Sequence, residues 1–336
     1  MAEIVLGIGT SHTPLLTLEA GDWAHRAETD YTNERLNLSD GRWISYPDLL
    51  AEVGPRYAAE AALEVLHEKE KRCQTSLDNL KAEIEAAAPD VMLVIGDDQS
   101  ELFGKENLPT FSIFYGETVI THDRWTEGPE WVMSMGRGYA MDAVHSFPGA
   151  PEFARDLITG LMQRHIDVST SDRVVDPHRA GFGHAFGFIV ERLLGARPIP
   201  IVPLLLNTYY PPNVPTAARV HDIGRALRDA INDHPSSLRV AIIASGGLSH
   251  FIVDEELDRK VIDGFKAENA VLLRELPPGA LNSGSSEILN WIMAAGAVDH
   301  LPLKWLDYEP LYRTPAGTGV GAAFGVWASD QENRQC

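Results

Sequence analysis

The sequence is poor in cysteine and in basic residues, and each shortage excludes a class of protein. Its 336 residues include two cysteines, Cys73 and Cys336, and neither belongs to a C-x-x-C pair. A disulfide framework and a structural zinc site are therefore not expected, and a reducing cytoplasm fits. Lysine and arginine number 28 against 48 aspartates and glutamates, which gives a formal net charge of -20. This balance argues against nucleic acid or an anionic membrane surface as a partner.

Long apolar runs, internal repeats and Pro/Ser-rich linkers are also missing. No stretch approaches the roughly 18 apolar residues that span a bilayer, and the start Met1-Ala2-Glu3 lacks the basic region of a secretory signal. Because no linker divides the chain, we expect one α/β domain over residues 1–330, with a central mixed sheet flanked by helices. Residues 15–88 are expected to form an insertion of loop and helices, and 117–149 a loop-rich lid. Helices are predicted within 49–88 (one long or two shorter), 151–164, 183–194, 217–232 and 288–295.

Three apolar, strand-like runs each end in polar side chains. Residues 4–9 precede Ser11-His12-Thr13-Pro14, residues 91–95 precede Gly96-Asp97-Asp98-Gln99, and residues 240–243 precede Ser245-Gly246-Gly247-Leu248-Ser249-His250. Ligands and chemistry collect at the carboxyl edge of open α/β sheets. Three strand ends that each carry a metal ligand or a proton-transfer group therefore point to an enzyme.

Each candidate residue also has a simple structural explanation. His12 and His250 are each compatible with a hydrogen-bonded histidine after a strand, and Glu287 sits where a helix dipole favours a carboxylate. His184 lies at a predicted helix start among phenylalanines, surroundings that favour its neutral form, and His178 is the alternative for the same role. Taken singly, the structural explanations are favoured.

Taken together, these motifs resemble the class III extradiol ring-cleavage dioxygenases, the superfamily of protocatechuate 4,5-dioxygenase β subunits. The Ser-Gly-Gly-Leu-Ser-His element is the most specific part, and the resemblance covers almost the whole chain. It implies that His12 and Glu287 are ligands of a mononuclear Fe(II), that His250 is the active-site acid/base, and that His184 is a second active-site histidine. It further implies a mixed sheet with helices on both sides, assembled as a dimer or with a small partner subunit.

The sequence departs from the family at the remaining iron ligand, which is normally a histidine after the strand at residues 91–95. Here the segment reads Gly96-Asp97-Asp98-Gln99, and Asp98 is the expected ligand, with Asp97 or Gln99 as alternatives. Two carboxylates and one imidazole would leave a divalent site formally neutral. Such an oxygen-rich set would admit Mn(II) or another divalent metal more readily beside Fe(II).

Three functions follow from these residues. The leading hypothesis is O2-dependent cleavage of a dihydroxylated aromatic ring (catechol-, protocatechuate- or aminophenol-like), with His250 moving protons and with His178 and Asn207 near the substrate. The second is a metal-dependent hydrolase or lyase on the same scaffold. The third is a non-catalytic binding protein or partner subunit. A homo-oligomer, a dimer or larger, is expected in each case.

Overall fold

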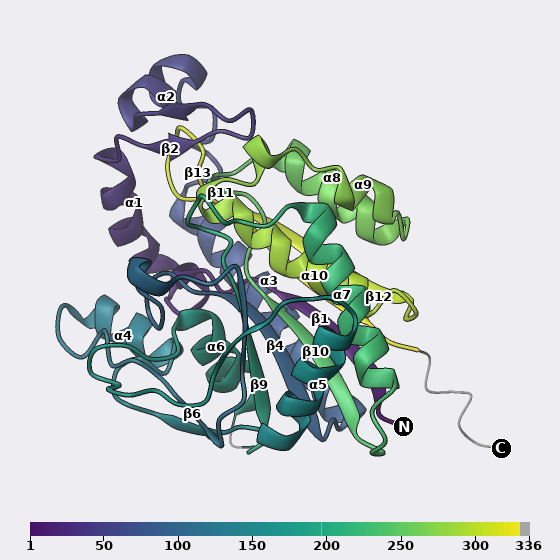
Figure 1. Cartoon of the computed structure of the whole chain (residues 1–336). Coiled ribbons are helices and arrows are strands. Elements are labelled where there is room, and N and C mark those ends of the chain that lie inside the picture. Colours follow the sequence, from purple (N-terminus) through teal and green to yellow (C-terminus); the bar gives the residue numbers. More distant parts are fainter. Residues whose placement is uncertain (196, 330–336) are drawn as a thin grey trace.

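Four parallel strands form the centre of the sheet in the computed structural model, which describes residues 1–195 and 197–329. They lie in the order β1 (Glu3–Thr10), β10 (Arg239–Ser245), β4 (Val91–Asp97) and β9 (Ile201–Leu206). Each pairs in parallel with the next, so their carboxyl ends meet at one edge of the sheet (Figure 1). The three runs that the sequence analysis singled out are β1, β4 and β10. Cys336 lies outside the described residues.

Shorter and antiparallel strands extend the sheet on both sides. Beyond β9 lie β5 (Phe111–Phe114) and β8 (Ser169–Ser171), and β5 is antiparallel to β9. On the other side, β13 (Thr318–Trp327) is antiparallel to β1, to β11 (His250–Ile252) and to β12 (Leu303–Tyr312). Within the described residues this makes a nine-stranded mixed sheet, as expected.

Apolar side chains that point alternately to the two faces of the central strands divide the core into two layers. In β4, Leu93 and Ile95 pack on one face, whereas Met92 and Val94 pack on the other, because successive side chains of a strand point to opposite faces. The first face is covered by α5 (Pro151–Gln163), α7 (Ala217–Asn232), α8 (Glu255–Lys266) and α10 (Ile288–Ala297). The second face is covered by α3 (Leu63–Ala87) and α6 (His184–Phe188), which continues as a π-helical segment, Ile189–Leu194. The predicted sheet between helical layers is confirmed.

The helix predicted within 49–88 divides in two, α2 (Tyr46–Val53) and α3. It breaks at Gly54-Pro55, because Gly54 has φ +66° and a proline disfavours helical backbone in the residue before it. The expected insertion and lid contain regular elements as well as loops. Residues 15–48 hold α1 (Trp23–Tyr31) and the hairpin of β2 (Leu36–Asn37) and β3 (Trp43–Ile44), and 117–149 hold β6 (Thr118–Ile120), α4 (Glu130–Gly138) and β7 (Ser146–Pro148). In the described part of the chain, no helix is long and apolar enough to cross a membrane.

Candidate metal centre and substrate cavity

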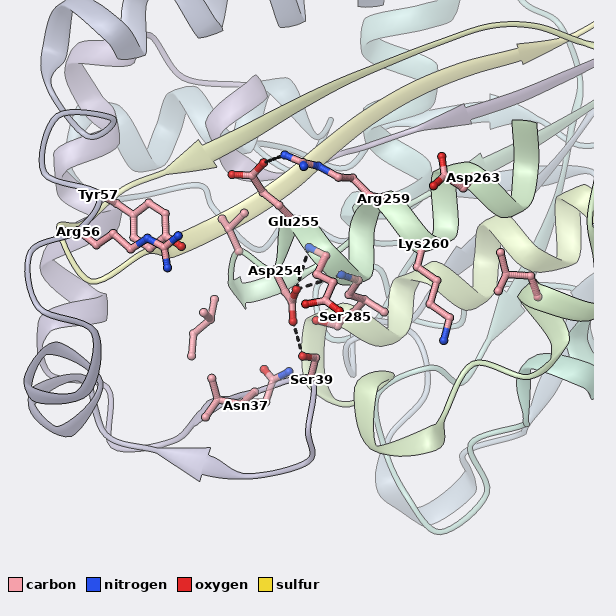
Figure 2. A pocket seen from close by; sticks show the side chains of 16 residues that line it. Asn37, Ser39, Arg56, Tyr57, Asp254, Glu255, Arg259, Lys260, Asp263 and Ser285 are labelled. Atoms are coloured by element: carbon pink, nitrogen blue, oxygen red, sulfur yellow. Dashed lines mark hydrogen bonds and ion pairs between the residues drawn. The ribbon is translucent and has the colours of Figure 1, made fainter. Parts of the chain in front are cut away.

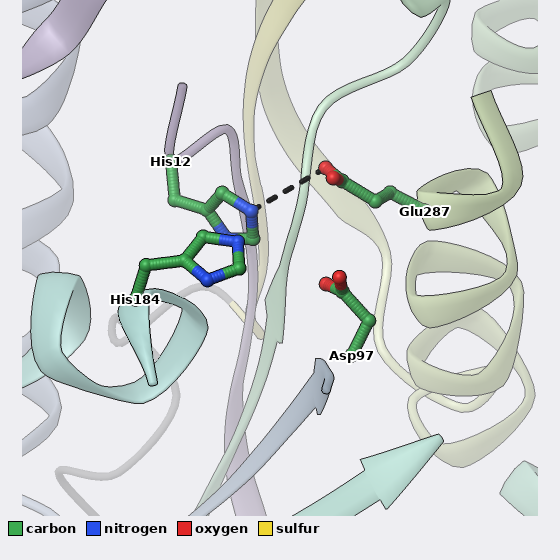
Figure 3. A group of neighbouring side chains, drawn as sticks. All are labelled: His12, Asp97, His184 and Glu287. Carbon is green, nitrogen blue, oxygen red and sulfur yellow. Dashed lines mark ion pairs between the residues drawn. The ribbon is translucent and has the colours of Figure 1, made fainter. Parts of the chain in front are cut away.

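Four buried side chains from different elements converge at the carboxyl edge of the sheet (Figure 3). His12 follows β1, Asp97 ends β4, His184 begins α6, and Glu287 ends the 3-10 turn Ser283–Glu287 that leads into α10. One ligand atom from each lies within 4.8 Å of the ligand atoms of the others. Two imidazoles and two carboxylates are suitable donors for a divalent transition metal.

The hydrogen bonds of His12 fix which of its nitrogens is free. The Ser245 hydroxyl donates its proton to the Ala185 carbonyl at 2.7 Å, so its 2.9 Å contact with His12 Nδ1 requires that Nδ1–H is the donor. Nε2 has no hydrogen-bond partner and lies 3.4 Å from Glu287 Oε2. In the neutral ring, a buried lone pair therefore faces a buried carboxylate, an arrangement that a metal ion between them would stabilise.

The two carboxylates of the group differ in their surroundings. Asp97 Oδ2 accepts a hydrogen bond from Gln99 Nε2 at 3.2 Å, and Oδ1 has no partner. Burial raises the pKa of Asp97, and the charge of Glu287 raises it further. Burial also opposes ionisation of Glu287, but the neighbouring His250 and His12, with the Gly247 N–H at 2.7 Å, outweigh it and lower the pKa of Glu287 to about 2. Glu287 is thus held as an anion, while Asp97 gains most from a nearby cation.

The structure differs from the sequence prediction at Asp98. Its carboxylate turns back onto the following loop and accepts hydrogen bonds from the backbone N–H groups of Glu101, Leu102 and Phe103, at 2.8–3.0 Å. These three bonds occupy both oxygens, and Asp98 is not in the four-residue group. The preceding residue, Asp97, lies beside His12 and Glu287 instead. The carboxylate expected at this strand end is present, one position earlier.

His184 is paired with a carboxylate that the sequence analysis missed. Its Nδ1 lies 2.8 Å and 3.0 Å from the two oxygens of Glu101, and its backbone N–H donates to the same group. Burial alone would lower the pKa of His184, but the charge and hydrogen bonds of Glu101 raise it to about 9. The expectation of a neutral imidazole at a helix start is therefore corrected to an ion pair. No local pattern indicates it, because the partners are 83 residues apart.

His250 also lies close to Glu287. Its Nδ1 is 3.0 Å from the Leu248 carbonyl and so carries a proton, whereas Nε2 is 3.7 Å from Glu287 Oε2. The Ser285 hydroxyl accepts from the backbone N–H of His250 and donates to its carbonyl, which fixes the residue in place. Burial lowers the pKa of His250 despite the opposing charge of Glu287. The neutral ring therefore presents a basic Nε2 to the site.

The two residues expected near the substrate lie elsewhere. His178 is exposed and pairs with Asp123 at 2.6 Å. The amide of Asn207 donates to the Tyr210 carbonyl and to Asn213, and its oxygen accepts from the Tyr210 N–H. Its role is to hold the turn that carries Tyr209. Neither His178 nor Asn207 lines the cavity beside the four-residue group.

That cavity has a volume of about 230 Å³ and opens onto His12, His184, His250 and Glu287. Apolar and aromatic side chains form much of its wall, including Trp125, Met135, Tyr139, Tyr209 and Phe251. Two arginines, Arg26 of α1 and Arg124, also line it. The segments expected as insertion and lid thus both contribute walls. The size and lining suit a single aromatic ring with polar substituents.

A comparison with protein families agrees with this geometry. Residues 60–324 match the family described as the catalytic LigB subunit of aromatic ring-opening dioxygenase. The chain belongs to the LigB family. A gallate dioxygenase from Pseudomonas putida is 32% identical over 135 residues, which are 37% of this chain and 38% of that protein. The matched part thus spans well under half of the curated relative. The resemblance inferred from the motifs is confirmed at the level of the family.

A second, wider cleft of this LigB-family chain lies next to the site, with a volume of about 820 Å³ (Figure 2). It runs between α8 and the segment around Asn37 and Tyr57. Several of its charged groups already have partners, since Glu255 pairs with Arg259 at 2.5 Å and Asp254 accepts from the Ser39 hydroxyl. Ser285, whose hydroxyl holds the His250 backbone, lines this cleft and connects it to the candidate site.

Proposed function

We propose that this chain is a non-heme, metal-dependent dioxygenase that opens the ring of a dihydroxylated aromatic compound with O2. Membership of the LigB family supports ring-opening chemistry, and the Pseudomonas putida relative supports a catechol-type substrate. The observation that carries the metal is the buried, unpartnered Nε2 of His12, which faces Glu287 beside the unpartnered Oδ1 of Asp97. Two donors without protein partners beside a buried carboxylate fit a cation site.

His12 Nε2, Asp97 and Glu287 would hold the metal, with Fe(II) as the first choice and Mn(II) as the alternative for a set with two carboxylates. The metal, when bound, supplies chelation of the two ring oxygens and the one-electron chemistry that reaction with O2 needs. His184 has a different role in this proposal. Its pairing with the buried Glu101 raises the pKa of His184 and favours the protonated ring, which suits a hydrogen-bond donor.

The two remaining histidines have complementary proton states. His250 is neutral, with Nδ1–H held by the Leu248 carbonyl, so Nε2 accepts a proton from a substrate hydroxyl and later returns it. His184 is cationic and donates a hydrogen bond to oxygen that becomes negative in the reaction. Trp125, Met135 and Phe251 exclude water from the reacting groups.

Oxygen uptake tests the proposal. The protein is purified without air, its metal content is measured, and O2 consumption is followed with catechol, protocatechuate, gallate and an aminophenol. We expect uptake with at least one of them, a yellow ring-opened product, and loss of both on treatment with a chelator. Metal-loaded protein that consumes no O2 with any substrate, yet hydrolyses or eliminates from one of them, would instead support the hydrolase or lyase hypothesis. The cytoplasmic location and the homo-oligomer stay predictions.

A further inference from the structure

Arg26 is a cation without a partner in the wall of the substrate cavity. It lies on α1 and lines the same cavity as His12, His184 and Glu287. Its Nε is buried and has no hydrogen-bond partner. Among the described residues, no carboxylate forms an ion pair with it. Other arginines of this acidic chain are paired, for example Arg72 with Glu309 and Arg274 with Asp222. A half-buried arginine without such a pair is costly unless a ligand neutralises it.

The carboxylate of Asp30, whose charge acts on Arg26, is hydrogen-bonded to another cation. Asp30, one turn along α1, is buried and accepts two hydrogen bonds from Arg313 at 2.8 Å and 3.0 Å. The Thr318 hydroxyl donates to Asp30 as well, at 2.7 Å. Burial and the charge of Arg313 both lower the pKa of Arg26. Two arginines therefore share one carboxylate, and this end of the cavity keeps an uncompensated positive charge.

Arg124, the other arginine of the cavity, is less free. It lies close enough to the buried Glu101 to help lower the pKa of that carboxyl, and its guanidinium stands 5.7 Å from the centre of the Trp125 ring. Glu101 and the ring face thus interact with Arg124, whereas Arg26 shares the charge of Asp30 with Arg313. Of the two cations, Arg26 is the one with a buried nitrogen that has no hydrogen-bond partner.

We propose that Arg26 determines substrate specificity by binding a carboxylate substituent on the aromatic ring. This inference rests on the proposed function and goes beyond it, because it assigns the anionic group to a residue. The planar guanidinium matches a carboxylate with two parallel hydrogen bonds. A carboxylate held there would orient the ring hydroxyls toward His12, Glu287 and His250, at the acidic part of the same cavity.

The test compares one pair of substrates on matched variants. 3,4-Dihydroxybenzoate and 3,4-dihydroxybenzamide have nearly the same shape and differ in charge. Arg26→Gln should lower kcat/KM for the acid by about 10–100-fold, the usual range for a lost hydrogen bond to a charged group, and change that for the amide by less than about 3-fold. Arg26→Lys should recover part of the loss, because an ammonium keeps the charge without the planar fork. The control is Arg173→Gln, which removes the same charge from an exposed side chain.

A binding measurement separates this inference from the proposed function. Calorimetry with 4-hydroxybenzoate, which cannot chelate a metal through two hydroxyls, should show binding to the metal-free wild type and to Arg173→Gln but at least 10-fold weaker binding to Arg26→Gln. If ring opening fails with all substrates while this difference persists, the proposed reaction is wrong and the anion site stands. The assignment would be overturned if Arg26→Gln lowered kcat/KM equally for the acid and the amide. It would also be overturned if Arg124→Gln, and not Arg26→Gln, lowered kcat/KM for the acid.

The folded state supplies an independent check. Because the Arg26 guanidinium forms no hydrogen bond or ion pair with the described residues, Arg26→Gln should not lower the melting temperature of the ligand-free protein. A marked loss of stability would mean that Arg26 supports the fold, and the proposal would then fail.

Discussion

The neighbouring aspartates Asp97 and Asp98 offer a matched test of the metal centre. Both are buried, and the same change to asparagine removes one charge from each while keeping the shape. Asp97 faces His12 and Glu287, whereas Asp98 binds three backbone N–H groups of its own loop. Asp97→Asn should therefore affect the metal, and Asp98→Asn should affect the fold.

The size of the stability effect follows from the hydrogen bonds. An asparagine at 98 can keep the two bonds to Oδ1 but turns an N–H2 toward the Phe103 N–H, which leaves a buried donor without a partner. The expected cost is about 1–3 kcal/mol. With about 2.1 cal/mol/K per residue, a chain of this length loses roughly 1.5 °C per kcal/mol, so the melting temperature should fall by about 1.5–4.5 °C. Asp97→Asn removes a carboxylate that repels Glu287, so the metal-free variant should be no less stable than the wild type.

The response to metal separates the variants further. At a free metal concentration 100 times the dissociation constant, binding adds about 2.7 kcal/mol, or roughly 4 °C by the same entropy. Thermal scans with and without added Fe(II) under nitrogen should show this rise for the wild type and for Asp98→Asn, and little or none for Asp97→Asn. If Asp98→Asn abolishes the rise and Asp97→Asn keeps it, the assignment of Asp97 is wrong and the residue predicted from sequence is the ligand.

Three further outcomes are expected. His250→Phe should retain metal and reduce kcat by about 10²–10⁴-fold, and an equal loss of metal would make His250 a ligand instead. Ser245→Ala removes the acceptor that fixes the His12 tautomer, so competition with a chelator should show about 10–100-fold weaker metal binding, and an unchanged affinity would contradict the tautomer argument. Asp258 is fully buried against Ser249 and Tyr308, and burial raises its pKa from 3.8 to about 7. The protonated form of Asp258 stabilises the fold and is lost as the pH rises through about 7. The melting temperature of Asp258→Asn relative to that of the wild type should therefore rise between about pH 5 and pH 8.5. If the difference between the two melting temperatures is the same at every pH, the pKa of this carboxyl is near its ordinary value.

Sequence patterns located the fold and the strand ends because these depend on local periodicity. The apolar spacing of residues 217–232 matches α7, and the runs before His12 and Ser245 are β1 and β10. Local periodicity does not decide whether Asp97 or Asp98 faces the metal centre. β4 runs through Asp97, which keeps that side chain at the sheet edge, while the direction of Asp98 depends on three N–H groups of a loop whose conformation is not coded by any short pattern. The pairings of Glu101 with His184 and of Asp30 with Arg313 join distant segments, so they become visible only in the folded chain.

The pairing of β13 has a consequence for how this protein is made. β13 pairs with β1, where Phe324 is opposite Thr10, and with β11, where Val320 is opposite His250. On a ribosome, the strand that secures the segment of His12 is synthesised more than 300 residues after it. A nascent chain that stops before Thr318 already contains all four residues of the metal group but lacks the strand that fixes two of the site's histidines. Metal insertion should therefore follow synthesis of β13, and fragments from premature termination should remain metal-free.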